Sequence, residues 1–278
     1  MKDFLENATI TDGVPIQSAP GSRASQAARP LVLLVDGGGR KVFLFDGTAL
    51  VVGRDKPSKN PQIGLCLRRL PCERAHPENW EVNCRISHQH ATLAWREGGF
   101  SVRDEHSENG TFLGAATGMT GVDLGGSVSG MAGTVSESGR VDGFQPCPAG
   151  EWVQLPPTGV LRLGRELLAM PFVVLASGVA AGALWIGRSG NCEHHHYLLL
   201  APGGATDFGA LGFAGLAGLV VRSHGARFEL LANSRGFEDD AMTIPPGGSR
   251  LLEPGLRITA GRLAIAVRSA TDDEMITP

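Results

Sequence analysis

Short apolar runs recur along the chain, and glycine, proline or asparagine turns separate them. Residues 31–35 are wholly apolar and end at a run of glycines, and residues 41–45 follow before Asp46-Gly47. Two strands joined by a glycine-rich turn are predicted here. Residues 100–102 alternate between apolar and polar, as expected of a half-buried strand. The same signals predict further strands at residues 49–52, 63–67, 91–95, 111–113, 152–155, 160–164 and 172–175.

The segments between these runs are predicted to lack regular structure. Residues 1–30 are rich in Ser, Ala, Gly and Pro and are interpreted as a flexible leader. Residues 68–83 are interpreted as a polar loop, and residues 115–150 as a glycine-rich insertion in a surface loop. Because no segment carries a sustained helical period with caps, the chain is predicted to be all-β.

Composition narrows the class of protein. Of 278 residues, 42% are hydrophobic and 19% charged, which supports a buried core, and 39 glycines with 17 prolines favour strands and turns over helices. The net charge of −3 gives no electrostatic case for nucleic acid or a membrane surface. The charged residues 1–8 and the lack of a long apolar segment predict a cytoplasmic protein without a membrane span.

The five cysteines predict neither a disulfide framework nor a zinc site, because their number is odd and no C-x-x-C pair occurs. Cys66, Cys72, Cys84 and His76 were weighed as metal ligands, and reduced thiols are the favoured interpretation. In the run 193–196 (Glu-His-His-His), consecutive strand residues alternate faces, so at most two side chains converge on one ion. Neither a metal nor a cofactor is predicted.

Four motifs follow one another between residues 51 and 114. They are Val-Val-Gly-Arg-Asp at 51–55, Arg-Ile-Ser-His-Gln-His-Ala at 85–91, Phe-Ser-Val-Arg-Asp at 100–104 and Ser-Glu-Asn-Gly-Thr-Phe-Leu-Gly at 107–114. Each motif alone is weak. In this order and at these spacings they resemble the forkhead-associated (FHA) domain, a β-sandwich of two mainly antiparallel sheets that binds phosphothreonine peptides.

The residues of these motifs suit a phosphate site at the loops of a sandwich. Arg54 offers a forked guanidinium, Ser87 a hydroxyl donor and Asn109 an amide for a peptide backbone. The resemblance implies the same roles: Arg54 and Ser87 contact phosphate, and Asn109 contacts the peptide. It also implies that Gly53, His90 and Gly110 shape the loops.

Other residues near these motifs depart from the family pattern. Arg85 and His88 are added to the predicted phosphopeptide site as further donors. Glu108, an anion directly before Asn109, is expected either to weaken phosphate binding or to select a basic neighbour in the ligand. The long segment between the first two motifs adds further basic residues, namely Lys56, Lys59, Arg68, Arg69 and Arg74.

The second half of the chain echoes the first. Residues 184–188 echo 50–54, residues 219–230 echo 91–102, and residues 249–259 echo 152–164. Phe213 and Leu216 stand where the first copy has Ser87 and His90. A second, degenerate FHA-like β-sandwich without the site is therefore predicted, and an unrelated β tail remains the alternative.

The resulting division is a leader at 1–30, an FHA domain at 31–178, a degenerate sandwich at 179–270 and a tail at 271–278. The predicted function is that of an adaptor or scaffold module in Ser/Thr-kinase signalling, which binds phosphothreonine-containing proteins. The apolar run 208–221 of the second sandwich is expected to pack against the first domain, a second copy of the chain or another protein, so self-association is one of the options.

Two other functions were weighed. Catalysis by a triad of Ser87, His90 and Asp104 is rejected, because no nucleophile-elbow motif accompanies it. The alternative that remains open is a docking subunit whose binding does not depend on phosphorylation.

Overall fold

The structure, a computed structural model, describes residues 30–68, 75–115, 144–156, 158–164, 173–177, 182–188, 195–224, 227–271 and 276–277. Residues 1–29 of the predicted leader and residues 116–143 of the predicted insertion lie outside this part of the chain. Residues 272–275 and 278 of the tail lie outside it as well, as do Cys72, Cys192, Glu193 and His194.

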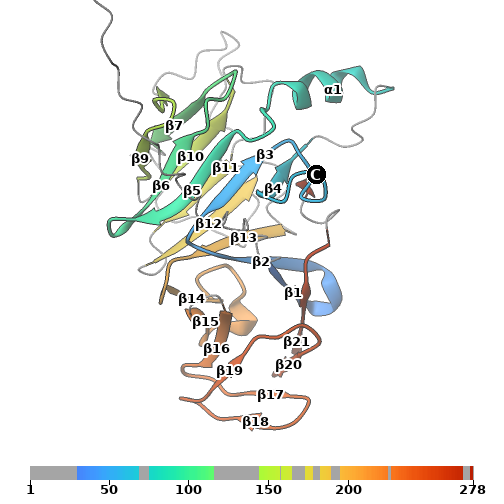
Figure 1. The fold of residues 1–278 in the computed structure, drawn as a ribbon. Coiled ribbons are helices and arrows are strands. Elements are labelled where there is room, and N and C mark those ends of the chain that lie inside the picture. Colours follow the sequence, from blue (N-terminus) through green and yellow to red (C-terminus); the bar gives the residue numbers. More distant parts are fainter. Residues whose placement is uncertain are drawn as a thin grey trace, which may run out of the picture.

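The predicted all-β sandwich fold is confirmed (Figure 1). Most of the strands belong to one large sheet of twelve. Its order is β18 (Thr243–Ile244), β17 (Phe237–Asp239), β20 (Arg257–Ala260), β21 (Leu263–Ser269), β1 (Leu31–Val35), β2 (Arg40–Asp46), β13 (His195–Leu200), β12 (Ala183–Arg188), β11 (Val173–Ser177), β10 (Thr158–Leu163), β7 (Thr111–Ala115) and β8 (Gln145–Pro146).

Two smaller sheets complete the fold. One has six strands, in the order β22 (Ile276–Thr277), β4 (Ile63–Leu67), β3 (Leu50–Gly53), β5 (Ala91–Arg96), β6 (Gly99–Asp104) and β9 (Trp152–Gln154). The other has four, in the order β14 (Ala205–Asp207), β15 (Leu219–His224), β16 (Arg227–Ala232) and β19 (Ser249–Leu251). Within the described residues, the short helical segments are η1 (Asp36–Gly38), α1 (Pro77–Cys84) and η3 (Ala214–Leu216).

The small sheets cover opposite faces of the large one. Along β2, Phe43 and Phe45 point into a core shared with the six-stranded sheet, whereas Val42 and Leu44 point into a core shared with the four-stranded sheet. Strands buried on both faces need continuous apolar sequence rather than alternation. The uninterrupted run Leu31–Val35 has this property.

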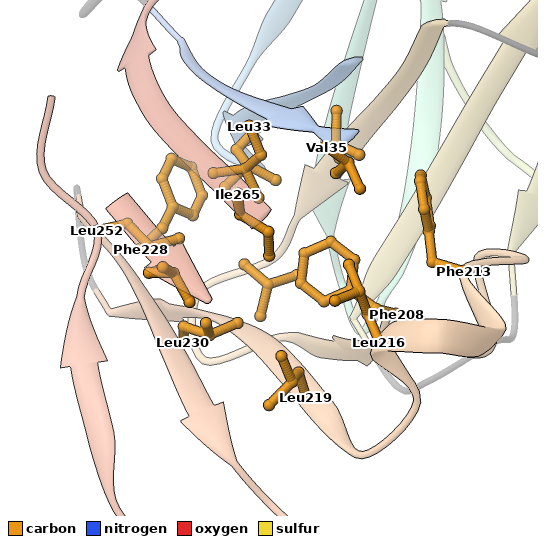
Figure 2. Close-up of a cluster of buried hydrophobic side chains, with 14 of the residues drawn as sticks. Leu33, Val35, Phe208, Phe213, Leu216, Leu219, Phe228, Leu230, Leu252 and Ile265 are labelled. Carbon is orange, nitrogen blue, oxygen red and sulfur yellow. The ribbon is translucent and has the colours of Figure 1, made fainter. Parts of the chain in front are cut away.

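Figure 2 shows the second core, which the predicted apolar run enters. Phe208, Phe213, Leu216 and Leu219 pack with Leu33 of β1, and each of these five side chains is almost fully buried. Burying one such side chain stabilises a fold by about 1.5–3 kcal/mol. The large apolar side chains of the run therefore pack inside their own chain, and self-association through the second sandwich stays a prediction.

The strands of the large sheet are arranged in a matching way on either side of its two central strands. β2 and β13 pair in parallel, with Leu44 opposite Leu198. On one side follow β12, β11, β10, β7 and β8, and on the other β1, β21, β20, β17 and β18. The early hairpin β1–β2 thus extends the strands of the C-terminal half, and the later hairpin β12–β13 extends those of the N-terminal half (Figure 1).

The strand order agrees with two of the three sequence similarities between the halves and disagrees with the third. The hairpins β5–β6 and β15–β16 do occupy matching places in the small sheets, and so do β9 and β19. The match of residues 184–188 with 50–54 is wrong, because β12 lies in the large sheet and β3 in a small one. The predicted boundary between 178 and 179 falls between β11 and β12, which are paired neighbours, and it stays a prediction.

The predicted polar loop at 68–83 contains helix α1, so this part of the prediction was wrong. Pro77 stands at the first helical position, where its missing N–H costs nothing, and Glu78 lies in the first turn. The helix ends at Cys84, directly before the motif that contains Ser87.

Candidate functional site

The sequence motifs meet where β3, β5 and β7 begin or end. The Arg54 amide donates to the Ser87 carbonyl at 3.1 Å, and the His90 amide donates to the Val52 carbonyl at 2.8 Å. These two bonds clamp residues 87–90 against the end of β3. The segment that follows α1 is thereby placed beside Arg54.

Gly53 is required by the closeness of this contact. A Cβ atom at position 53 would lie 2.0 Å from the carbonyl oxygen of His88, far inside contact distance. Because the obstructing atom belongs to the backbone, a side-chain rotation cannot relieve the clash. The loop-shaping role predicted for Gly53 therefore has a steric basis.

The guanidinium of Arg54 is fixed by two acceptors. Its Nη1 donates to the carbonyl oxygen of Cys84 at 3.3 Å, and its Nη2 lies 2.7 Å from Nε2 of His88. His88 Nδ1 in turn lies 2.7 Å from Oδ1 of Asp55. The Arg54 side chain is partly exposed, so its other N–H groups can face a ligand.

Ser87 joins two loops. Its Oγ accepts a hydrogen bond from the Glu108 amide at 3.0 Å, which leaves the hydroxyl proton as a donor. Glu108 itself is exposed. The backbone of Glu108 therefore lies next to Ser87, and its effect on phosphate binding stays a prediction.

The buried His90 side chain bonds to the backbone of the same two loops. The Ser87 amide donates to its Nδ1 at 3.1 Å, and its Nε2 is 3.1 Å from the carbonyl oxygen of Gly110. Nδ1 accepts, so the ring proton belongs on Nε2 and is donated to Gly110. The side chain is fully buried, and this burial lowers the pKa of His90, although the Gly110 carbonyl and Asp104 act in the opposite direction. His90 is thus a neutral structural histidine.

Asp104 organises the loop between β6 and β7. Its carboxylate accepts from the amide and hydroxyl of Ser107 at 2.8 and 2.6 Å, and from the hydroxyl of Thr111 at 2.6 Å. The side chain is 2% exposed. This anchor places Asn109 and Gly110 at the tip of the loop.

Asn109 reaches back toward α1. Its Nδ2 donates to the carbonyl oxygen of Arg85 at 2.8 Å, which leaves the Oδ1 oxygen as an acceptor. Gly110 has a φ of 77°, a left-handed conformation that suits glycine. The five predicted phosphopeptide contacts, Arg54, Arg85, Ser87, His88 and Asn109, thus form one connected cluster.

The basic residues between β3 and β5 are only partly described. Arg68 donates from Nε to the carbonyl oxygen of Arg54 at 2.5 Å and supports the backbone of the site. Lys56 and Lys59 belong to a tight turn that follows Asp55, whereas Arg69 and Arg74 lie outside the described residues.

Two contributors were missed from the sequence. Asp55 was quoted as part of a motif but was given no role, although a carboxylate next to Arg54 is a candidate partner for His88. Asp104 was considered only as a triad member. The spacing Asp104-x-x-Ser107 is a side-chain-to-backbone turn signal that would have identified its loop-anchoring role.

The contacts of His90 also argue against a catalytic triad of Ser87, His90 and Asp104. His90 Nδ1 accepts from the backbone amide of Ser87 and Nε2 contacts Gly110, so neither ring nitrogen is bonded to the Ser87 hydroxyl.

Burial raises the pKa of the Cys66 and Cys147 thiols to about 11, which keeps both protonated and poor as nucleophiles. Among the described residues, no cluster of three or more His, Cys, Asp or Glu side chains could hold a metal.

Residues 50–119 match the family model of the FHA domain. In these residues the chain is similar to an FHA domain, a class of protein-interaction module that generally binds phosphopeptides and is generally non-enzymatic. The described part of the chain has no helix long and apolar enough to span a membrane.

Two solved structures are similar to the chain. The FHA domain of a hypothetical protein from Arabidopsis thaliana shares 17% identity, with 58% of this chain and 97% of that chain covered and a TM-score of 0.27. The FHA domain of the CT664 protein from Chlamydia trachomatis shares 16% identity, with 49% and 89% covered and a TM-score of 0.22. No curated protein matches the sequence.

Proposed function

We propose that the chain binds phosphothreonine peptides through the loops that contain Arg54, Ser87 and Asn109. In this proposal Arg54 and Ser87 bind the phosphate, Asn109 binds the peptide backbone, and Arg85 and His88 flank them. The observation that carries the proposal is that hydrogen bonds bring these segments together at one end of the sandwich. Arg54 contacts His88, and Asn109 donates to the backbone carbonyl of Arg85. The amide of Glu108, the residue before Asn109, donates to the Ser87 hydroxyl. A rigid scaffold thereby presents a cation, a hydroxyl and an amide together.

The chemistry of the cluster matches a phosphate monoester. Such a group carries between one and two negative charges near neutral pH and offers strong acceptor oxygens. Each charge-assisted hydrogen bond to it is worth about 1.5–3 kcal/mol net. Two or three such bonds, less the cost of ordering the ligand, correspond to an affinity in roughly the micromolar range.

The preference for threonine over serine is implied by the family resemblance. With it comes the proposed cellular role, that of an adaptor or scaffold in Ser/Thr-kinase signalling whose partners are phosphorylated proteins. The C-terminal half is proposed to be a degenerate FHA-like sandwich. In support, its small sheet matches the first in strand order, while Phe213 and Leu216 are buried where the first copy has polar groups.

An array of phosphothreonine peptides with degenerate flanks tests the proposal, with each peptide also present unphosphorylated. We expect binding to phosphorylated spots only. Arg54→Ala should abolish it, whereas the matched control Arg257→Ala, which removes an exposed arginine from β20 in the other half, should leave it unchanged. Equal binding to both peptide forms would instead support a docking subunit that ignores phosphorylation.

A further inference from the structure

Arg54, His88 and Asp55 form a chain of three polar side chains within the site. Nη2 of Arg54 is 2.7 Å from Nε2 of His88, and Nδ1 of His88 is 2.7 Å from Oδ1 of Asp55. The sequence predicts His88 to be a further donor at the phosphopeptide site. The geometry gives it a different partner in the ligand-free protein.

The donor and acceptor roles along this chain follow from the groups themselves. A guanidinium has only donors, so Nε2 of His88 must accept the bond from Arg54. The ring proton then belongs on Nδ1, and it is donated to the Asp55 carboxylate. Asp55 thereby selects the tautomer in which His88 can accept from Arg54, just as a carboxylate orients a metal-binding or catalytic imidazole.

We propose that His88, held in one tautomer by Asp55, is a positioning residue that fixes the Arg54 guanidinium for the phosphate. The inference rests on the proposed function, because the contact between Arg54 and phosphate is itself part of that proposal. His88 acts through Arg54 and is not itself the principal phosphate ligand. Asp55 is the second positioning residue.

The free donors of Arg54 support this role. A guanidinium carries five N–H groups, of which one bonds to Cys84 and one to His88, so three remain for a phosphate. The two fixed bonds hold both terminal nitrogens, so the fork is oriented before the ligand arrives. A long side chain that is already ordered loses less conformational entropy on binding.

The exposure of His88 and Asp55 is consistent with this arrangement. The His88 side chain is 66% exposed and Asp55 only 20%. The Asp55 carboxylate is thus largely covered and its Oδ1 is occupied by His88. His88 is accessible enough to be replaced without opening the core.

The test compares three variants of the whole chain. His88→Gln can place a side-chain oxygen near the Nε2 position and so keeps an acceptor, whereas His88→Ala and Asp55→Ala remove one link each. His224→Ala removes an exposed histidine at the end of β15 and is the matched control. Thermal unfolding identifies any variant that fails to fold.

The first readout needs no ligand. In nitrogen-15 spectra of the free protein, the Arg54 side-chain N–H signals should be protected in the wild type and in His88→Gln. They should be broadened by solvent exchange in His88→Ala. Unchanged Arg54 signals in a folded His88→Ala protein would overturn the proposal, whether or not a phosphopeptide binds.

The second readout is affinity for a phosphothreonine peptide chosen from the array. His88→Ala should weaken binding about tenfold, the effect of one charge-assisted hydrogen bond, and His88→Gln should restore it to within about twofold. A Gln variant as weak as the Ala variant overturns positioning by an acceptor. If no peptide binds the wild type, the proposed function fails, and the spectra alone decide the role of His88.

Discussion

Arg54 carries the positive charge at the centre of the site, and its shape matters as well as its charge. Its guanidinium is held by Cys84 and His88, and three of its five N–H groups are not used in these two bonds. A lysine keeps the charge but has no fork to satisfy these acceptors and two phosphate oxygens at once. Arginine and lysine at position 54 should therefore give sharply different affinities for a phosphorylated peptide.

We expect Arg54→Lys to weaken phosphothreonine-peptide binding about tenfold and Arg54→Ala about a hundredfold or more. Isothermal titration calorimetry measures both. Lysine binding as tightly as arginine would mean that charge alone, without directed hydrogen bonds, holds the phosphate.

His90 links stability to pH. Its pKa in the folded protein is lowered, mainly by burial, so below the ordinary histidine pKa of about 6.5 the unfolded chain takes up a proton that the folded chain refuses. The contribution of His90 is therefore intact above that pKa. It is lost as pH falls from there toward the lowered folded value.

We expect the free energy of unfolding to decrease with acidification in that window by more in the wild type than in His90→Gln, which has no titrating ring. Denaturant unfolding at a series of pH values measures the difference. Parallel pH profiles for the two proteins would show that His90 is not held neutral. The wild type should be the more stable of the two above the window, since Ser87 and Gly110 bond to the ring.

At the scale of elements, the junction between β3 and residues 87–90 determines whether the site forms. Gly53→Ala places a Cβ atom against the His88 carbonyl, whereas Gly39→Ala meets its nearest atom at an ordinary 3.7 Å with a φ of −61°. We expect the first change to destabilise the protein by at least about 2 kcal/mol and the second to be nearly neutral. Chemical denaturation compares them, and a Gly53→Ala protein as stable as Gly39→Ala would contradict the packing described.

Sequence reasoning located most of the site because its motifs are local. Ile63–Leu67 was predicted with the observed bounds, and the strands around Arg54, Ser87 and Asn109 lie where the pattern placed them. The sequence pattern does not predict helix α1, because Pro77–Cys84 has no apolar stripe. Only Pro77 and Glu78 in its first turn indicate a helix. The role of Asp55 depends on a side-chain contact with His88 that no spacing rule states.

At the scale of the whole molecule, the two halves are interleaved. The apolar hairpins β1–β2 and β12–β13 each extend the part of the large sheet that belongs to the other half, and they contribute side chains to both cores. The sequence could not show this, because a hairpin pattern predicts its own two strands and not the neighbour with which it pairs.

This arrangement predicts one cooperative unit. We expect the whole chain to unfold in a single calorimetric transition, because either core loses part of its lining if the other opens. A fragment that ends at residue 178 lacks β12 and β13 and should be unfolded or aggregated. Two separate transitions, or a fragment with the stability of the whole chain, would show that the halves are independent.

The central claim is that this end of the sandwich recognises a phosphorylated threonine. Calorimetric titration of the wild-type chain with one array-selected peptide, in its phosphothreonine, phosphoserine and unphosphorylated forms, tests it most directly. We predict roughly micromolar binding of the phosphothreonine form, weaker binding of the phosphoserine form and none of the unphosphorylated peptide. Equal heats and affinities for the phosphorylated and unphosphorylated peptides would contradict the claim.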